Sequence, residues 1–154
     1  PETIKKMEES IIVFYTGRTR SSSALLRDQS DNMKQADKRE LMSNMVSLAY
    51  EMRGLLENND VEPLGELLDK NWQLKRQMTI GISDFQIDGW YKKGILAGAT
   101  GGKLLGAGNG GFLMFFAPKE KHTDIIKAMK GLQRVPFSFD NGGSKIVFSD
   151  QMKE

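Results

Sequence analysis

The sequence predicts an α+β fold with one antiparallel four-stranded sheet and helices packed on one face. Four short apolar runs rich in β-branched and aromatic residues lie far apart in the chain, whereas apolar residues recur at helical spacing between them. The predicted strands are residues 11–16, 112–117, 135–139 and 145–149. Their order with the helices is strand, four helices, strand, helix, strand, strand. A chain of 154 residues can bury its own core, so we expect a single domain, 1–154.

The helix start signals follow the first strand, which Gly17 ends. Ser21, Ser22 and Ser23 offer N-caps for a helix that runs to about Met33. The next three helices have start signals of the same kind. These are Asp37 with Glu40 as a capping box, Asp60 as a cap with Pro63 in the first turn, and Ser83 with Gln86 as a second capping box.

The C-terminal third alternates strands with one helix. The apolar strand from Phe112 stops before Pro118, and a helix over about 120–130 is closed by Gly131 at its C-terminus. An Asp-Asn-Gly-Gly turn joins the last two predicted strands. Trp72, Trp90 and Tyr91 occupy helical apolar positions, which favours core or domain-interface packing over the stacking of a base or sugar.

The stretch 98–117 is unusually rich in glycine, with seven glycines among twenty residues. Clustered glycine costs backbone entropy, and it allows positive φ and close approach of a ligand. Gly106, Gly108 and Gly111 match the dinucleotide fingerprint, but an apolar strand follows instead of the required helix. The P-loop pattern fails as well, because Leu104 follows the Gly-Lys pair. The alternatives left are a ligand-binding loop, which the glycine density favours, and a purely structural feature, either a tight connection between two elements or a bulged hairpin.

Three segments resemble one family. The sequence GGKLLGAGNGGF, residues 101–112, resembles the third signature motif of the GHMP kinases, the small-molecule kinases related to galactokinase, homoserine kinase and mevalonate kinase. FYTGRTRSSS, residues 14–23, resembles the opening of the C-terminal domain in the branch that phosphorylates heptose 7-phosphate. The spacing of residues 81–83, 87–88 and Gly98 is similar to the spacing that precedes the third motif in that branch of the family. Asn109 stands where the family usually has glycine, and Asn tolerates left-handed backbone, so we expect the loop geometry to be kept.

The resemblance implies the C-terminal domain of an ATP-dependent sugar kinase, with a ferredoxin-like core and extra helices. The reaction would move the γ-phosphoryl of ATP to a hydroxyl of a heptose phosphate with Mg²⁺. The family's serine-rich phosphate loop and catalytic carboxylate belong to an N-terminal ATP-binding domain, which this sequence lacks. We therefore expect no catalytic residue, no bound cofactor or metal and no kinase activity in this chain alone. Its expected partners are that N-terminal domain and a sugar phosphate.

Two groups of candidate site residues follow. The glycine loop is expected to line the nucleotide and substrate cleft through Lys103, Gly106, Ala107, Gly108, Asn109, Gly110 and Gly111. The second group combines arginine donors with hydroxyls at a helix start, which suits the phosphate of the substrate. It consists of Arg18, Arg20, Ser21, Ser22 and Ser23. The alternatives to ligand binding are that the serines are ordinary capping residues beside solvated arginines, and that Lys103 is a solvated lysine.

Composition excludes several classes of function. The chain has no cysteine and one histidine, which argues against a zinc site. A formal charge of +2, with scattered basic residues, argues against nucleic-acid binding. No apolar run has membrane-spanning length and no signal peptide is visible, so we expect a cytoplasmic protein. A stand-alone α+β ligand-binding or regulatory module without catalysis is the alternative to the kinase domain.

Overall fold

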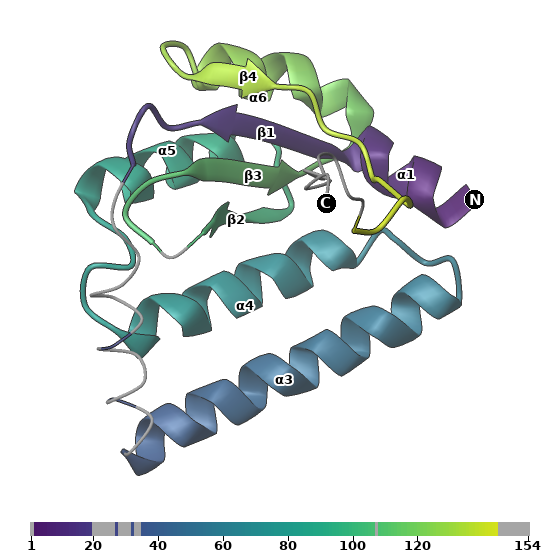
Figure 1. The fold of residues 1–154 in the computed structure, drawn as a ribbon. Helices are drawn as coiled ribbons and strands as arrows, with labels where there is room; N and C mark the ends of the chain where they lie inside the picture. The colour runs from purple at the N-terminus through teal and green to yellow at the C-terminus, as the bar shows by residue number, and fades with distance from the viewer. Residues whose placement is uncertain (1, 20–26, 28–31, 33–34, 107, 145–154) are drawn as a thin grey trace, which may run out of the picture.

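A computed structural model describes residues 2–19, 27, 32, 35–106 and 108–144 of the chain (Figure 1). The elements in order are α1 (Glu2–Ser10), β1 (Ile11–Tyr15), α3 (Ala36–Glu57), α4 (Leu64–Met78), α5 (Phe85–Leu96), β2 (Gly101–Leu105), β3 (Phe112–Phe116), a 3-10 turn η1 (Lys119–Lys121), α6 (His122–Ala128) and β4 (Gln133–Val135). The first helix, α1, has no counterpart in the sequence-based prediction. Of the predicted helix over 21–33, only residues 27 and 32 are described, and the rest lies outside the described residues.

The four strands form one sheet in the order β2-β3-β1-β4, and every neighbouring pair is antiparallel. β1 is central: Val13 lies opposite Met114 of β3 on one side and Val135 of β4 on the other. Helices connect β1 to β2, and α6 connects β3 to β4. This is the ferredoxin-like arrangement, so the predicted α+β class and antiparallel four-stranded sheet are confirmed.

The identity of two strands differs from the prediction. Residues 101–105 form β2, which pairs with β3 as an antiparallel hairpin whose connection is the glycine loop. The prediction had these residues only as a segment leading into that loop. Of the predicted strand 135–139, only Val135 belongs to the sheet, because Pro136 has no N–H to continue the ladder. The predicted strand 145–149 lies outside the described residues.

The helices α3 to α6 match predicted helices, but the predicted caps do not hold. α3 begins after Gln35 and α4 after Pro63, and neither N-cap makes a side-chain hydrogen bond, so Asp37 and Asp60 are not caps. At α5 the cap is Asp84, one residue after the predicted Ser83. Gly131 does adopt the positive φ expected of it, +99°, three residues after α6 ends.

The main apolar core lies between one face of the sheet and the helices α5 and α6, which cover that face (Figure 1). Ile12 and Phe14 of β1 point into it, and α4 contributes Trp72, which is fully buried. Ile11 and Val13 point to the opposite face, where they form a smaller cluster with Leu64. The predicted core positions of Trp72 and Tyr91 are thus confirmed.

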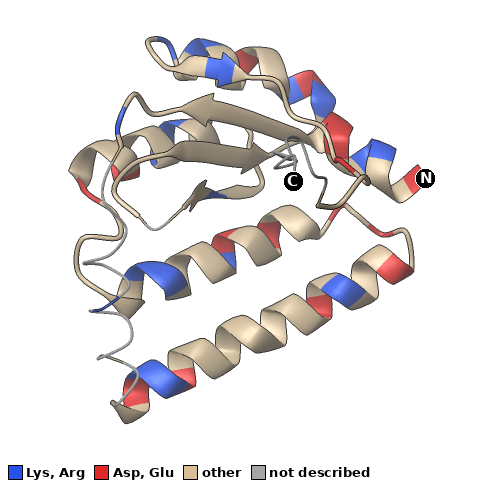
Figure 2. Ribbon diagram, in the orientation of Figure 1, with Lys and Arg blue, Asp and Glu red and all other residues tan. Residues whose placement is uncertain are grey.

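The helix α4 runs along the edge strand β2, and α3 packs on the outer side of α4 (Figure 1). No residue of α3 is fully buried. Its charged residues gather towards its two ends and its middle has none (Figure 2). Exposed Met42, Val46 and Tyr50 lie along that middle stretch, so the methionine-rich helix is only partly a core helix. Within the described part of the chain, no helix is long and apolar enough to cross a membrane.

Candidate functional site

The glycine loop joins β2 to β3 at one end of the sheet. Gly106, Gly108 and Gly111 have φ values of +107°, +123° and +100°, and Asn109 has φ +54°. L side chains rarely adopt such values, and asparagine is among the few that do so readily. The expectation that Asn109 keeps the geometry of a glycine-rich loop is therefore confirmed.

Two glycines of the loop are also required by close packing on neighbouring backbone. A Cβ on Gly108 would lie 2.9 Å from the Cα of Ile82, and a Cβ on Gly110 would lie 2.8 Å from the carbonyl oxygen of Arg18. The loop is thus wedged between the segment before α5 and the segment after β1. Tight packing accounts for both glycines by itself, so the loop's proposed role towards a ligand has to rest on other evidence.

Backbone hydrogen bonds hold the loop on both sides. The Thr16 N–H and Oγ1 both donate to the carbonyl oxygen of Gly111, at 3.0 and 2.8 Å. The N–H of Gly111 donates to the carbonyl oxygen of Arg18 at 2.9 Å, and the N–H of Asn109 donates to that of Ile82 at 2.8 Å. These bonds tie three segments that are remote in sequence into one small unit.

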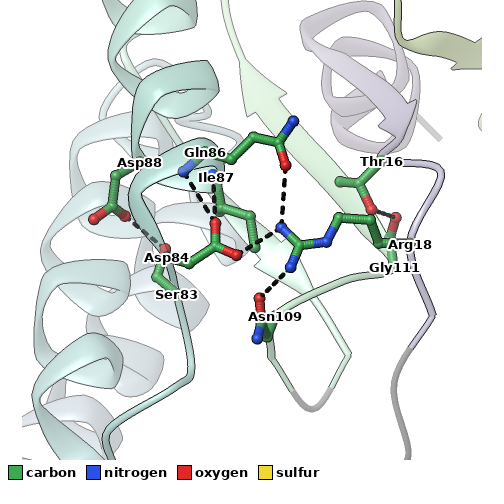
Figure 3. A network of polar contacts seen from close by, with 9 residues as sticks. All are labelled: Thr16, Arg18, Ser83, Asp84, Gln86, Ile87, Asp88, Asn109 and Gly111. Carbon is green, nitrogen blue, oxygen red and sulfur yellow. Dashed lines mark hydrogen bonds and ion pairs between the residues drawn. The ribbon is translucent and has the colours of Figure 1, made fainter.

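The Arg18 side chain lies at the centre of this unit (Figure 3). Its Nη1 donates to Oδ2 of Asp84 at 2.6 Å and to Oε1 of Gln86 at 3.4 Å, and its Nη2 donates to Oδ1 of Asn109 at 2.9 Å. Such charge-assisted bonds are stronger than neutral ones. The guanidinium therefore links the glycine loop to the start of α5.

Asp84 serves two partners at once. Its Oδ2 accepts from Arg18, while its Oδ1 accepts from the N–H groups of Gln86 and Ile87 at 3.0 Å and caps α5. Desolvation alone would raise the pKa of Asp84, but the Ile87 N–H and the Arg18 guanidinium stabilise the carboxylate and hold its pKa below the usual value. The contacts of Asp84 in the folded chain therefore favour its charged form.

A second ion pair lies behind the first, at the next turn of α5. Arg76 of α4 donates to Oδ2 of Asp88 at 2.6 Å, and the Ser83 hydroxyl donates to Oδ1 at 2.5 Å. A polar pocket of about 310 Å³ borders these three side chains. Ser83 therefore orients Asp88 instead of capping the helix, and Asp88 has a structural role as the partner of Arg76.

Two lysines lie where α4 passes β2. Lys75 Nζ donates to the carbonyl oxygen of Gly106 at 3.1 Å, and Lys103 Nζ lies 3.5 Å from Oδ1 of Asn71. Burial lowers the pKa of both lysines, and the charge of Lys103 lowers that of Lys75 further. Lys103 is therefore half-buried at the base of the glycine loop, not freely solvated.

The structure brings only part of the predicted site together. Lys103, the described loop residues and Arg18 lie within one connected region, whereas Arg20, Ser21, Ser22, Ser23 and Ala107 lie outside the described residues. Sequence reasoning missed Thr16, Asp84 and Lys75 as parts of it. No local sequence pattern predicts them, because each forms its hydrogen bond with a residue at least 31 positions away.

The described residues contain no group of three His, Cys, Asp or Glu side chains that could hold a metal ion. The two aspartates at the start of α5, Asp84 and Asp88, are each already paired with an arginine. The donor set in this part of the chain thus does not fit a metal centre.

Comparison with protein families gives a match over residues 52–132, more than half of the chain, to the model described as GHMP kinases C terminal. The D-glycero-alpha-D-manno-heptose 7-phosphate kinase of Campylobacter jejuni is 29% identical over 142 residues, which cover 91% of this chain and 42% of that protein. The mevalonate kinase of Pyrococcus horikoshii is 31% identical over 142 residues, with coverage of 88% and 42%. The chain thus spans about two fifths of these curated relatives.

Solved structures agree with these sequence matches. The L. major mevalonate kinase in complex with R-mevalonate superposes with a TM-score of 0.73 at 25% identity, over 80% of this chain and 40% of that one. The Methanococcus jannaschii mevalonate kinase gives 0.68 at 21% identity, over 88% and 41%, which supports the fold alone.

Proposed function

This chain belongs to the GHMP kinase family, as the C-terminal domain, and from that premise we propose that the intact protein is an ATP-dependent kinase that phosphorylates a hydroxyl of a heptose phosphate. The observation that carries the proposal is the glycine loop of the family's third motif, which is hydrogen-bonded to the backbone of Ile82 and Arg18 and to the Arg18 side chain. Phosphoryl transfer depends mainly on positioning and electrostatics, and a loop anchored on both sides provides positioning.

In this proposal the domain forms one wall of the active site. An N-terminal kinase domain of the same protein supplies the other wall, the nucleotide phosphate loop and the catalytic carboxylate. The chain alone is then inactive. Because Asp84 and Asp88 are each already paired with an arginine, we assign no Mg²⁺ ligand to them. We also propose a cytoplasmic location, since the phosphoryl donor ATP is available there.

The substrate class rests on two supports. The first is the similarity to the Campylobacter jejuni heptose 7-phosphate kinase over 91% of the chain. The second is the segment from Arg18 to Ser23, in which arginines precede three hydroxyls. We propose that Arg18, Arg20, Ser21, Ser22 and Ser23 orient the phosphate of the sugar. Arg18 already donates to Asp84 and Asn109, so it would act with its remaining N–H groups.

The test is a coupled assay of ADP release with ATP and Mg²⁺. The full-length protein encoded by the source gene is compared with the chain of residues 1–154. D-glycero-D-manno-heptose 7-phosphate, the 1-phosphate and mevalonate are offered in turn. We expect turnover by the full-length protein with a heptose phosphate and none by the chain alone.

The outcomes separate the parts of the proposal. Turnover with mevalonate and not with heptose phosphates would keep the kinase and reject the sugar substrate. Turnover by residues 1–154 alone would reject the division of labour between the two domains. A source gene without an upstream kinase domain would favour the non-catalytic module.

A further inference from the structure

The lysines Lys75 and Lys103 form a pair of positive charges at the base of the glycine loop. Lys75 is on α4 and reaches the carbonyl oxygen of Gly106. Lys103 is on β2 and reaches Asn71, which lies one helical turn before Lys75 on the same side of α4. The two ammonium groups therefore share the seam between helix and strand where the chain enters the loop.

Neither lysine has a carboxylate partner among the residues that the structure describes. Their hydrogen-bond acceptors are a backbone carbonyl and an amide oxygen, both neutral. Asp69, the carboxylate of α4 closest in sequence to Lys75, accepts at its Oδ1 from the Tyr91 hydroxyl at 2.6 Å and from Gln73 at 3.0 Å, and it forms no ion pair with either lysine. Asp88 is paired with Arg76. The pair thus differs from Arg76 and Asp88, and from Arg18 and Asp84, which neutralise one another.

This arrangement is unfavourable for the free chain. Partial burial penalises each charged ammonium, and two like charges close together penalise it again, which is why the pKa of Lys75 is lowered by both causes. A structural role does not require it, because methionine or glutamine would fill the same space without either penalty. An anion from outside the described residues would relieve both.

We propose that Lys75 and Lys103 bind a phosphate oxyanion of a substrate at the entrance of the glycine loop. The space is available there: Gly106 is exposed, and a Cβ on it would meet no atom within 4 Å. Ammonium groups bind phosphate as point charges from several directions, so they need no preformed fork. The choice of phosphate over other oxyanions rests on the proposed kinase function, whereas the site itself rests on the two lysines.

The first test uses the chain of residues 1–154 and inorganic pyrophosphate as the probe. Calorimetric titration is done on the parent chain, on Lys75→Gln, on Lys103→Gln and on the control Lys92→Gln, an exposed lysine of α5. Loss of one charge-assisted bond predicts an affinity lower by roughly tenfold for each site variant. Lys92→Gln should leave the affinity unchanged. Absent binding, or equal binding by all four chains, would overturn the proposal.

A second readout separates a ligand role from a structural one. Because the two charges repel each other, Lys103→Gln should leave the melting temperature of the ligand-free chain unchanged or raise it, while it removes the increase caused by pyrophosphate. A fall in the ligand-free melting temperature, with the pyrophosphate increase kept, would mean that the lysine supports the fold and not an anion site.

The full-length protein identifies the source of the phosphate. A higher KM for ATP in Lys103→Gln would assign the site to the nucleotide, and a higher KM for the sugar phosphate would assign it to the sugar. Unchanged KM values together with a less stable full-length protein would show that the lysines pair with a carboxylate of another domain, which would overturn the proposal. If the full-length protein has no kinase activity but pyrophosphate binding depends on both lysines, the anion site stands and the proposed function fails.

Discussion

Arg18 and Asp84 are 66 positions apart in the sequence and are joined by an ion pair of 2.6 Å. The same carboxylate caps α5, and the same guanidinium holds Asn109 of the glycine loop (Figure 3). One contact therefore sets the positions of three segments: the end of β1, the start of α5 and the loop. The precision of the candidate site depends on it.

The first prediction concerns this ion pair. Arg18→Gln should lower the free energy of unfolding by about 1–2 kcal/mol, a value reduced for the partial exposure of both side chains, 34% and 26%. The matched control is Arg53→Gln, whose partner Glu57 is 61% exposed, and its effect should stay below about 0.5 kcal/mol. Urea denaturation measures both. Equal effects would mean that the pair does not couple the segments.

The second prediction concerns pH. The pKa of Asp84 is lower in the folded chain than in the unfolded one, so its contribution to stability is present above the unfolded value of 3.8 and is lost as the pH falls through the folded value. Asp84→Asn keeps a good N-cap residue but does not titrate. Its melting temperature should therefore fall less steeply below about pH 4 than that of the parent chain. Parallel curves would contradict the assignment.

The third prediction uses two glycines of α5. A Cβ on Gly94 would collide with the Phe115 ring, whereas a Cβ on Gly89 would meet no atom within 4 Å. Gly94→Ala should destabilise the chain by about 1–3 kcal/mol through overpacking. Gly89→Ala should stabilise it by up to about 1 kcal/mol, because alanine is the better helix former. Thermal unfolding of the two variants tests the packing of α5 on the sheet, and the same sign for both would refute it.

The fourth prediction concerns the buried hydroxyl of Tyr91, which donates to Asp69 at 2.6 Å. Burial and the Asp69 carboxylate both raise the pKa of Tyr91, so the phenol remains a neutral donor. Tyr91→Phe should cost about 1.5–3 kcal/mol of stability, the range for a hydrogen bond to a charged group. Tyr50→Phe, at a side chain 68% exposed, should stay within about 0.5 kcal/mol. A loss as small for Tyr91 as for Tyr50 would show that water replaces the bond.

Local residue type was sufficient for several elements. The apolar run from Phe112 to Phe116 forms a strand as predicted, although its first residue, Phe112, is exposed. The helix α5 also forms where its apolar residues recur at helical spacing. Asn109 adopts positive φ because of a conformational preference that it carries by itself. The family resemblance depended on such contiguous residues, and the comparisons confirmed it.

Local sequence patterns did not predict features that depend on contacts with residues elsewhere in the chain. Ser83 and Asp84 are both good capping residues, and Asp84 caps α5 while Ser83 bonds to Asp88. β2 contains two glycines, which have low strand propensity, yet it pairs along its length with β3. Gly101 also lets α4 approach closely, since a Cβ there would collide with the carbonyl oxygen of Gly65. Neither outcome can be read from neighbouring residues.

The sequence by itself determined the fold class, the family and the positive φ of Asn109, because each depends on residues that are close together in the chain. The tertiary structure alone decided that Arg18 pairs with Asp84, that Lys75 lies near enough to Lys103 to feel its charge, and that β2 belongs to the sheet. The two charge contacts span 66 and 28 positions, and the partners in the β2–β3 ladder are 7 to 15 positions apart, so neighbouring residues do not announce them. The physical reason is that charge pairing and strand pairing act through space, and only the folded chain brings the partners within reach.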